Sequence, residues 1–178
     1  MDTNIRQDPE ALERRIRLVD EHVQAEGVDH DVEAIMRTWG KAPWYDDVAW
    51  NEQWYGRDQI ESHYRELLHA FPDMGLDVKK RWVTEDAVII EVVVTGTHKG
   101  DWRGLPALGR RMESRVGTIY TFDEDGMIEL ERTYYDKAEI LEQLGLFKDP
   151  RTPLGKVAAV LTPPFEIIRA LVRRIFRR

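Results

Sequence analysis

With 178 residues, 42% of them hydrophobic, the chain is long enough for one domain with a sizeable core plus a terminal segment. It has no cysteine, which excludes a disulfide framework, a thiolate metal site and a cysteine nucleophile. From Arg151 onward there are seven basic residues and one acid, a net charge of +6, whereas the first 150 residues carry 19 basic and 32 acidic residues, a net of -13. An acidic body argues against a nucleic-acid-binding core.

Met1–Glu10 is polar and lacks the apolar segment of a signal peptide, so we expect a cytoplasmic protein. The first helix is predicted to begin with Asp8 as N-cap and Pro9 at its first position, and to end at Gly27. Its apolar face repeats at helical spacing through Leu12, Ile16, Val19 and Val23. A second, shorter helix is predicted over Asp29–Trp39.

The segment from Trp39 to Tyr55 is the most aromatic part of the chain. It follows neither a strand nor a helix period, so we expect a folded loop with short strands. One interpretation is that its rings fill the core, and the other is that some of them stack on a flat polycyclic ligand. Its aromatic residues are Trp39, Trp44, Tyr45, Trp50, Trp54 and Tyr55.

A strongly amphipathic helix is predicted over Gly56–Phe71, where Pro72 ends it. Its inward face consists of Ile60, Tyr64, Leu67, Leu68 and Phe71. His63 and His69 fall on or near the polar side, where a solvated histidine needs no functional reason. Leu76–Val83 then forms a charged strand, which we expect at an edge of a sheet or strongly curved.

Three further strands are predicted between Val88 and Asp136, and their side chains alternate between two faces. On the first, His98 extends the apolar face of Val88, Ile90, Val92 and Val94. The middle strand, Arg111–Phe122, places Met112, Ser114, Val116, Thr118, Tyr120 and Phe122 together. On the third, Arg132, Tyr134 and Asp136 share a face with Ile128 and Leu130. We expect these polar groups to face a pocket, with the glycine-rich segment between His98 and Arg111 at its mouth.

The opposite face of these strands carries Ile89, Val93 and Ile119, which would be exposed apolar surface in a monomer. We therefore predict a homodimer through the outer face of the sheet.

Four pieces of the sequence, in this order and spacing, are similar to one known family. They are Gly56–Ile60, Ala70–Asp73, Thr95–Gly100 with Gly104–Pro106 and Gly109–Arg110, and Tyr135–Asp136 followed by Gln143–Gly145. Together they resemble the SnoaL-like polyketide cyclases, also called ester cyclases, of the nuclear-transport-factor-like superfamily. The resemblance implies an α+β fold in which a cone-shaped, curved antiparallel sheet wraps around N-terminal helices. It divides the chain into a helical extension (1–28), the SnoaL-like domain (29–147) and a linker with a tail (148–178).

The resemblance also implies a function. An aspartate matching Asp136 would act as the general acid/base of an intramolecular aldol closure on a polyketide-like or other hydrophobic carbonyl substrate, without metal or organic cofactor. His98 could donate to the developing oxyanion. The residues expected to contact the small hydrophobic ligand are Arg132, Tyr134, Trp54, Trp44, Tyr45 and Tyr64.

Other interpretations of these residues stay open. Asp136 also begins a capping box with Glu139 before a helix that reaches Leu144. His98 could simply hydrogen-bond the glycine-rich segment, and Arg132 could pair with Glu113 or Asp136. The fold also serves non-catalytic binding or assembly modules, because a fold does not determine a function. We expect an enzyme if Asp136 and His98 line one closed cavity, and a module if tryptophans fill it.

Phe165–Arg178 is predicted to form a basic amphipathic helix outside the cone. At about 1.5 Å per residue it would span roughly 21 Å, less than the roughly 30 Å of a bilayer core, so it cannot cross a membrane. It could lie on an anionic membrane surface, bind a protein partner, or fold back on the acidic body of its own or a neighbouring subunit.

Overall fold

A computed structural model of the chain describes residues 9–161. It is an α+β fold in which one six-stranded sheet curves around helices, as predicted. In chain order the elements are α1 (Pro9–Gln24), η1 (Ala25–Asp29), α2 (Val32–Thr38), β1 (Trp39–Asp47), β2 (Glu52–Tyr55), α3 (Arg57–Ala70), β3 (Gly75–Val83), β4 (Ala87–Thr97), β5 (Arg111–Phe122), β6 (Ile128–Tyr134), α4 (Lys137–Gln143) and α5 (Pro153–Leu161).

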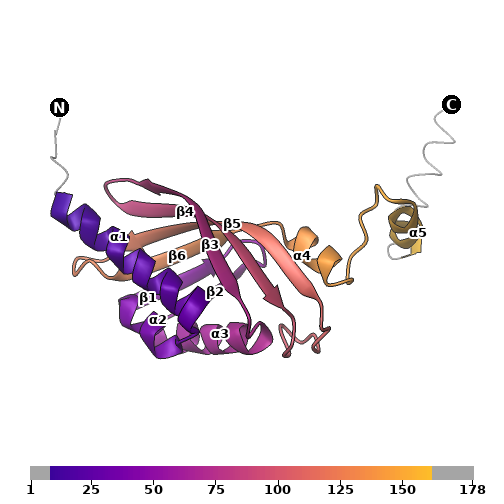
Figure 1. Cartoon of the computed structure of the whole chain (residues 1–178), viewed down its shortest axis with the longest axis horizontal. Helices are drawn as coiled ribbons and strands as arrows, with labels where there is room; N and C mark the ends of the chain where they lie inside the picture. Colours follow the sequence, from indigo (N-terminus) through magenta and orange to yellow (C-terminus); the bar gives the residue numbers. More distant parts are fainter. Residues whose placement is uncertain (1–8, 162–178) are drawn as a thin grey trace.

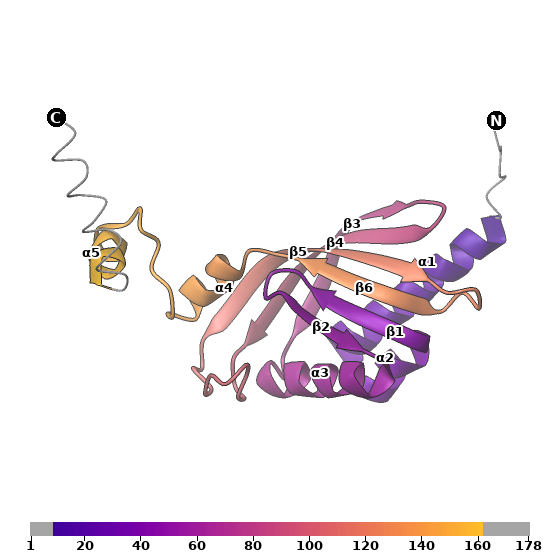
Figure 2. The ribbon, with the colours of Figure 1, turned by 180° about the vertical axis from the view of Figure 1, so that it is seen from behind.

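The strands lie in the order β2-β1-β6-β5-β4-β3. All neighbouring pairs are antiparallel except β1 and β6, which are parallel, so the prediction of an antiparallel sheet is right for all but this pair. The charged strand β3 lies at an edge, as predicted. The sheet forms an arch, with α3 and α2 along its open side and α1 crossing it (Figures 1 and 2).

The helices at the N-terminus belong to the core of the fold. The side chains of Val19 and His22 on α1 are 0% exposed, and Ile35 on α2 is equally buried. The predicted N-cap Asp8 lies outside the described residues. Where Gly27 was predicted to end the first helix, α1 instead continues into the π-helical turn η1, which buries Ala25, Glu26 and Gly27. π-Helical turns are rare and concentrate at functional sites, so this turn draws attention to Glu26.

The aromatic segment folds into the hairpin of β1 and β2, which agrees with the predicted short strands. Its two faces carry different rings. Tyr45 is buried in the core beneath the sheet, whereas its neighbour Trp44 stacks on Tyr55 with ring centroids 6.0 Å apart. The interpretation that the rings fill the core therefore holds for Tyr45, whereas the stacking of some rings on a ligand stays a prediction.

On β6 the predicted inward face is wrong for Arg132, Tyr134 and Asp136. The pairing with β5 runs Tyr120 to Glu131 and Thr121 to Leu130, but then Phe122 to Ile128, so Glu129 is an extra residue without a partner. A bulge of this kind reverses the alternation beyond it. As a result Glu131 and Thr133 are buried at 3% and 5% exposure, on the inner face, and Arg132, Tyr134 and Asp136 face away from the interior.

The C-terminal part contains α4 and, after an extended segment, α5, which stands apart from the sheet (Figure 1). The helix α5 was not predicted, although Thr152 and Pro153 form a typical start: the Thr152 hydroxyl accepts a hydrogen bond from the Gly155 N–H at 3.0 Å. The predicted basic helix Phe165–Arg178 lies outside the described residues. Within residues 9–161 no helix combines the length and apolarity that crossing a bilayer requires.

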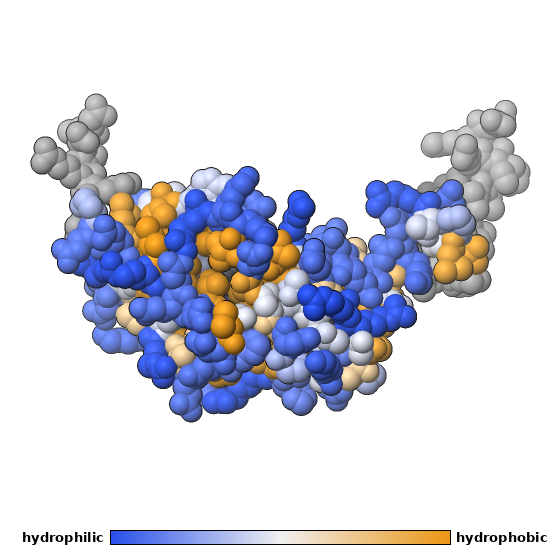
Figure 3. Space-filling view, viewed as in Figure 1, coloured by the Kyte–Doolittle hydropathy of each residue, from blue (hydrophilic) through white to orange (hydrophobic). Residues whose placement is uncertain are grey.

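The outer face of the sheet is partly apolar. Ile89 and Ile119 pair across β4 and β5 and are half-buried on the side opposite Val88 and Tyr120, as predicted. Figure 3 shows apolar patches over the β3 to β5 region of an otherwise mostly hydrophilic surface. A homodimer through this face stays a prediction.

Candidate functional site

The arch encloses a narrow inner cavity of about 90 Å³. We use the name inner cavity for the space between the concave face of the sheet, α3, η1 and α4. Most of its wall is apolar. The apolar lining consists of Leu67, Phe71, Met74, Leu76, Ile90, Val92, Val94, Trp102, Met112, Val116 and Ile140. The polar lining side chains gather in two groups, a deep carboxylate pair and a cluster at the throat.

The deep carboxylate pair consists of Glu26 on η1 and Glu131 on β6, both of which line the inner cavity. Glu131 accepts hydrogen bonds from the hydroxyls of Tyr64, at 2.7 Å, and Tyr120, at 3.4 Å. The Nε2 atom of His22 lies 3.2 Å from Glu131 and 3.8 Å from Glu26. All of these side chains are less than one-tenth exposed, so their interactions occur in a medium of low dielectric constant.

The hydrogen-bond directions orient the His22 ring. The Thr38 hydroxyl donates to the Ile35 carbonyl at 2.6 Å, so it must accept from His22 Nδ1, 2.7 Å away. The other ring nitrogen, Nε2, then faces both the Tyr64 hydroxyl at 3.1 Å and Glu131 at 3.2 Å. The Tyr64 hydroxyl donates to Glu131 at 2.7 Å, so His22, Tyr64 and Glu131 form one buried cluster.

Of the two carboxyl groups, Glu26 is the one whose pKa is raised. Burial raises its pKa well above the usual value, and the negative charge of Glu131 raises it further. No hydrogen-bond donor among the described residues lies in range of its carboxyl group. Burial likewise raises the pKa values of Tyr45, Tyr64 and Tyr120, which therefore keep their protons at neutral pH. The site thus combines a carboxyl group of raised pKa, Glu26, with Glu131, which receives hydrogen bonds from two tyrosine hydroxyls.

The same group could also hold a metal ion. One ligand atom from each of His22, Glu26 and Glu131 lies within 4.8 Å of the other two, and this is the single such set among residues 9–161. Imidazole and carboxylate ligands of this kind suit zinc, manganese or iron. The hydrogen bond from His22 to Thr38 would orient the ring for a metal as well as for a proton.

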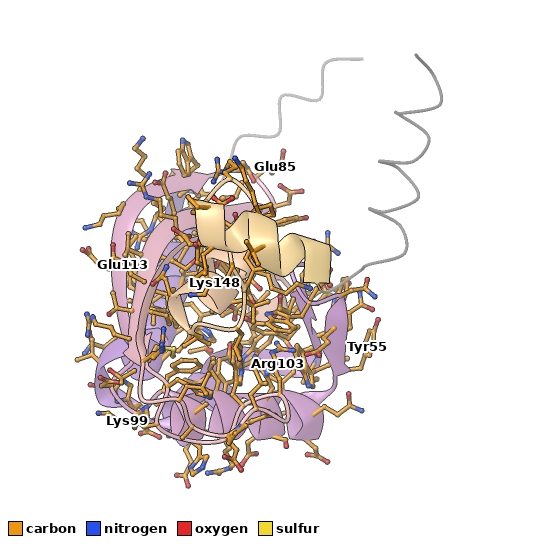
Figure 4. The ribbon with its side chains drawn as sticks, turned by 90° about the vertical axis from the view of Figure 1, so that its right-hand side faces the viewer. Tyr55, Glu85, Lys99, Arg103, Glu113 and Lys148 are labelled. Atoms are coloured by element: carbon orange, nitrogen blue, oxygen red, sulfur yellow. The ribbon has the colours of Figure 1, made fainter. Side chains whose placement is uncertain are left out.

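The throat of the cavity contains a third buried carboxyl group, that of Asp47, which has a cationic partner. Arg103 Nη2 donates to Asp47 Oδ2 at 2.8 Å, and the Tyr135 hydroxyl donates to the same oxygen at 2.7 Å. Arg103 also pairs with Glu52 through Nη1. Burial raises the pKa of Asp47, while Tyr135 and Arg103 act to lower it. In Figure 4 the Arg103 side chain lies in the middle of the opening, above α3.

Arg103 closes this opening from the glycine-rich segment between β4 and β5. Its backbone φ is 52° and that of Gly104 is 75°, which allows the tight turn that aims the side chain inward. The guanidinium carbon lies 4.6 Å from the centre of the Trp50 ring and 5.2 Å from that of Trp102. Outside it lies an outer groove of about 490 Å³, and four residues line both spaces: His63, Leu67, Trp102 and Arg103. We call these four the throat residues.

His63 is buried, contrary to the predicted solvated position, and only 6% of it is exposed. Its ring lies 4.0 Å from the Trp54 ring and 4.7 Å from the Tyr45 ring, measured between centroids. Burial lowers its pKa to about 3. Its Nε2 atom has no hydrogen-bond partner among the described residues.

Of the six residues predicted to contact a ligand, two line the inner cavity or the outer groove, and a third forms a hydrogen bond with a residue that lines the cavity. Tyr45 lines the inner cavity, Tyr64 lies behind Glu131, and Trp54 lines the outer groove. The other three lie on the outer face. Trp44 stacks on Tyr55; Arg132 bonds Asp46 at 2.6 Å, which is neither of the partners proposed for it; and Tyr134 is 45% exposed.

Neither residue predicted to be catalytic lines the inner cavity. Asp136 is exposed, and its carboxylate accepts hydrogen bonds from the N–H groups of Ala138, at 2.8 Å, and Glu139, at 3.3 Å, which is the capping interaction. His98 is fully buried on the predicted face, but it lies behind the cavity wall, stacked on Phe71 at 5.4 Å. Neither ring nitrogen has a partner in good hydrogen-bond geometry among the described residues, but the Gly100 backbone and the charge of Asp101 in the adjacent segment are close enough to act on its pKa. Burial lowers its pKa.

The cavity contains residues that sequence reasoning missed. His22 and Glu26 are four positions apart and interleave with Val19 and Val23, so the helical period could have placed them on the inward face. Glu131 could not be found in this way, because the bulge at Glu129 reverses the strand pattern. Asp47 and Arg103 are far apart in sequence, and only their contact shows their role.

Comparisons with solved structures support the same fold. AclR of Streptomyces galilaeus, a proposed hydroxylase, matches with a TM-score of 0.66 and 23% identity, over 77% of this chain and 99% of that one. A proposed SnoaL-like polyketide cyclase from Jannaschia sp. CCS1 matches with a TM-score of 0.64 and 21% identity, over 78% and 94%. A proposed polyketide cyclase from Xanthomonas campestris pv. campestris matches with 0.67 and 20%, over 75% and 98%.

No curated protein sequence matches the chain. The family model of the SnoaL-like polyketide cyclases matches residues 30–144, which is more than half of it. The match includes the whole curved sheet, α3 and α4, and with them Glu131, Asp47, Arg103 and His63. The chain belongs to the SnoaL-like polyketide cyclase family.

Proposed function

We propose that the protein is a cyclase- or isomerase-type enzyme that performs acid/base chemistry on a hydrophobic carbonyl compound, with Glu131 as the base and Glu26 as the acid. One observation carries this proposal. Two buried carboxyl groups line one apolar cavity, and burial together with the charge of Glu131 raises the pKa of Glu26 well above its usual value. Neighbouring carboxyl groups whose environments separate their pKa values are a common basis for assigning an acid and a base.

In this mechanism the Glu131 carboxylate removes a proton from the carbon next to a substrate carbonyl. The electron pair of that C–H bond moves into an enolate, and the Glu26 carboxyl group donates its proton to the enolate oxygen. For a cyclisation, the enol carbon attacks a second carbonyl of the same molecule, the enol O–H proton returns to Glu26 as the first carbonyl re-forms, and the new alkoxide takes the proton held by Glu131. The Tyr64 and Tyr120 hydroxyls stabilise Glu131 while it is an anion.

A proton-exchange assay tests this proposal without knowledge of the natural substrate. The probe is 2-acetylnaphthalene, an uncharged aromatic ketone, incubated with the protein in deuterium oxide. Removal and return of a methyl proton replaces hydrogen with deuterium, which mass spectrometry detects. We expect Glu131→Gln to reduce the protein-dependent exchange rate by about two to four orders of magnitude, the range usual for loss of a general base.

Glu129→Gln is the matched control, because Glu129 is an exposed glutamate on the same strand. It should exchange at the wild-type rate, and melting curves should show that both variants fold. Wild-type exchange in the Glu131→Gln variant, or none above background in the wild type, would contradict the assignment.

A non-catalytic binding module is the second candidate, and it is supported by the position of Asp136, the acid/base implied by the family resemblance, as an exposed helix cap. The inner cavity of about 90 Å³ is smaller than the common ligand pocket of about 300–1,000 Å³, which limits the size of the ligand for an enzyme and a module alike. The sequence predicted an enzyme if Asp136 and His98 line one cavity, and a binding module if tryptophans fill it. Neither condition is met, because neither Asp136 nor His98 lines the cavity, and Trp102 is its single tryptophan among the described residues. A module of this kind would bind the ketone without exchanging its protons.

A further inference from the structure

His63 occupies the position that a ligand must pass between the outer groove and the inner cavity, because it lines both. The ring is held between Trp54 and Tyr45, with a further contact to Tyr64 at 5.6 Å between centroids. Such packing leaves the imidazole little freedom to turn. Its Nε2 atom is buried and has no hydrogen-bond partner among the described residues, and the residue borders both spaces.

A buried polar atom without a partner has lost its hydration with no hydrogen bond in exchange, so it calls for an explanation. His63 does not provide a charge, since it stays neutral until the pH falls to about 3. A neutral imidazole has one N–H donor and one nitrogen acceptor, which suits a carbonyl or a hydroxyl group.

The charges around the throat also favour an uncharged ligand. Arg103 is the single cation among the described residues that line the inner cavity and the outer groove, and Asp47 and Glu52 already pair with it. The other ionisable carboxyl groups on the cavity wall are Glu26 and Glu131. Although the Arg103 Nε atom has no hydrogen-bond partner among the described residues, two carboxylates already offset the charge of this guanidinium, so an anionic ligand would lose its hydration here without meeting an excess of positive charge, which is costly.

We propose that His63 forms the hydrogen-bonding contact for an uncharged oxygen of the ligand, and that the throat thereby selects ketones, esters and alcohols over carboxylates. This inference rests on the proposed function for the position of the ligand. It concerns binding alone, so it can fail while Glu131 still acts as the base, and it can hold if the protein is a binding module.

The test compares two probes of similar size, uncharged 2-acetylnaphthalene and anionic 2-naphthoate, by isothermal titration calorimetry at pH 7. The wild type should bind the ketone more tightly. His63→Phe keeps an aromatic ring between Trp54 and Tyr45 but removes the hydrogen bond, and it should weaken ketone binding by about tenfold, as expected for one neutral hydrogen bond. His63→Gln, which restores a polar group near Nε2, should recover part of the affinity.

His98→Phe is the matched control. His98 is another fully buried histidine with unpartnered ring nitrogens and a stacked phenyl neighbour, but it lines neither the cavity nor the groove. Its replacement should leave ketone affinity unchanged. In nitrogen-15 NMR spectra of the wild type, the ketone should shift the His63 ring signals and not those of His98.

The inference is overturned if 2-naphthoate binds as tightly as the ketone, or if His63→Phe binds the ketone like the wild type. Loss of deuterium exchange in Glu131→Gln together with unchanged, His63-dependent ketone binding would support both proposals separately. Exchange that survives in Glu131→Gln while binding still depends on His63 would remove only the catalytic assignment.

Discussion

The two ends of the inner cavity both contain buried carboxyl groups, but the groups that surround them differ in charge. At the throat, Asp47 has a guanidinium partner, a phenol and a backbone N–H within hydrogen-bonding distance. At the deep end, Glu26 and Glu131 face each other with His22 as their nearest base. A permanent cation favours the charged form of a carboxylate, whereas burial and the negative charge of Glu131 raise the pKa of Glu26. The first arrangement suits a structural closure, and the second suits proton transfer.

The largest effect on stability should come from removing the cation at the throat. Arg103→Leu leaves Asp47, which is 3% exposed, without its charged partner and should destabilise the fold by about 3–5 kcal/mol, as measured by urea unfolding. Arg110→Leu is the control, because Arg110 lies in the same segment and is exposed. The double variant Arg103→Leu with Asp47→Leu should recover most of the loss. A cost below about 1 kcal/mol for Arg103→Leu would mean that the two ends do not differ as described.

The next effect depends on pH and concerns Glu26. Its pKa is raised in the folded state, so between the unfolded and the folded pKa values the folded protein binds more protons and loses stability as the pH rises. Glu26→Gln removes this loss. Relative to the wild type it should gain up to about 1.4 kcal/mol of stability per pH unit within that window.

Urea unfolding at several values from pH 4 to pH 8 measures this difference. Glu21→Gln, on the exposed side of α1, reports the effect of the same charge change at the surface. A stability difference between Glu26→Gln and the wild type that does not grow with pH would show that Glu26 is not held protonated by the fold.

The smallest effect is expected for Asp136, a carboxylate outside both clusters. Asparagine caps a helix about as well as aspartate, so Asp136→Asn should change stability by only a few tenths of a kcal/mol, while Asp136→Ala should cost about 1 kcal/mol more. Ketone proton exchange should be unchanged in Asp136→Asn. A fall of two orders of magnitude or more would instead support the acid/base role that the family resemblance implied for Asp136.

Much of the fold could be predicted from the sequence because it depends on local patterns. The apolar period of Gly56–Phe71 predicted α3, the charges of Leu76–Val83 predicted an edge strand, and the alternation in β4 and β5 assigned their inner faces. The resemblance to the family predicted how these elements assemble, and the family match confirmed it. Glycines and a proline between His98 and Arg111 indicated the turn that brings Arg103 to the throat.

The candidate site could be predicted only in part. Tyr45 and Tyr64 were expected near the ligand, and both lie at the cavity or behind it. His63 was misplaced because Trp54 and Tyr45 cover a position that the helical pattern of α3 leaves on its polar side. An amphipathic pattern records which side of a helix is mostly apolar, and it cannot show which distant rings pack over the remaining positions.

The sequence by itself determined where helices and strands form, because hydrophobic period, caps and turns act over a few residues. Only the tertiary structure decided which acids became buried partners. One extra residue, Glu129, reverses the faces of β6, so that Glu131 enters the cavity and Asp136 remains outside as a helix cap. The π-helical turn after α1 brings Glu26 to the same place. Both changes shift a strand or helix by a fraction of its repeat, and their consequences appear only where distant elements meet.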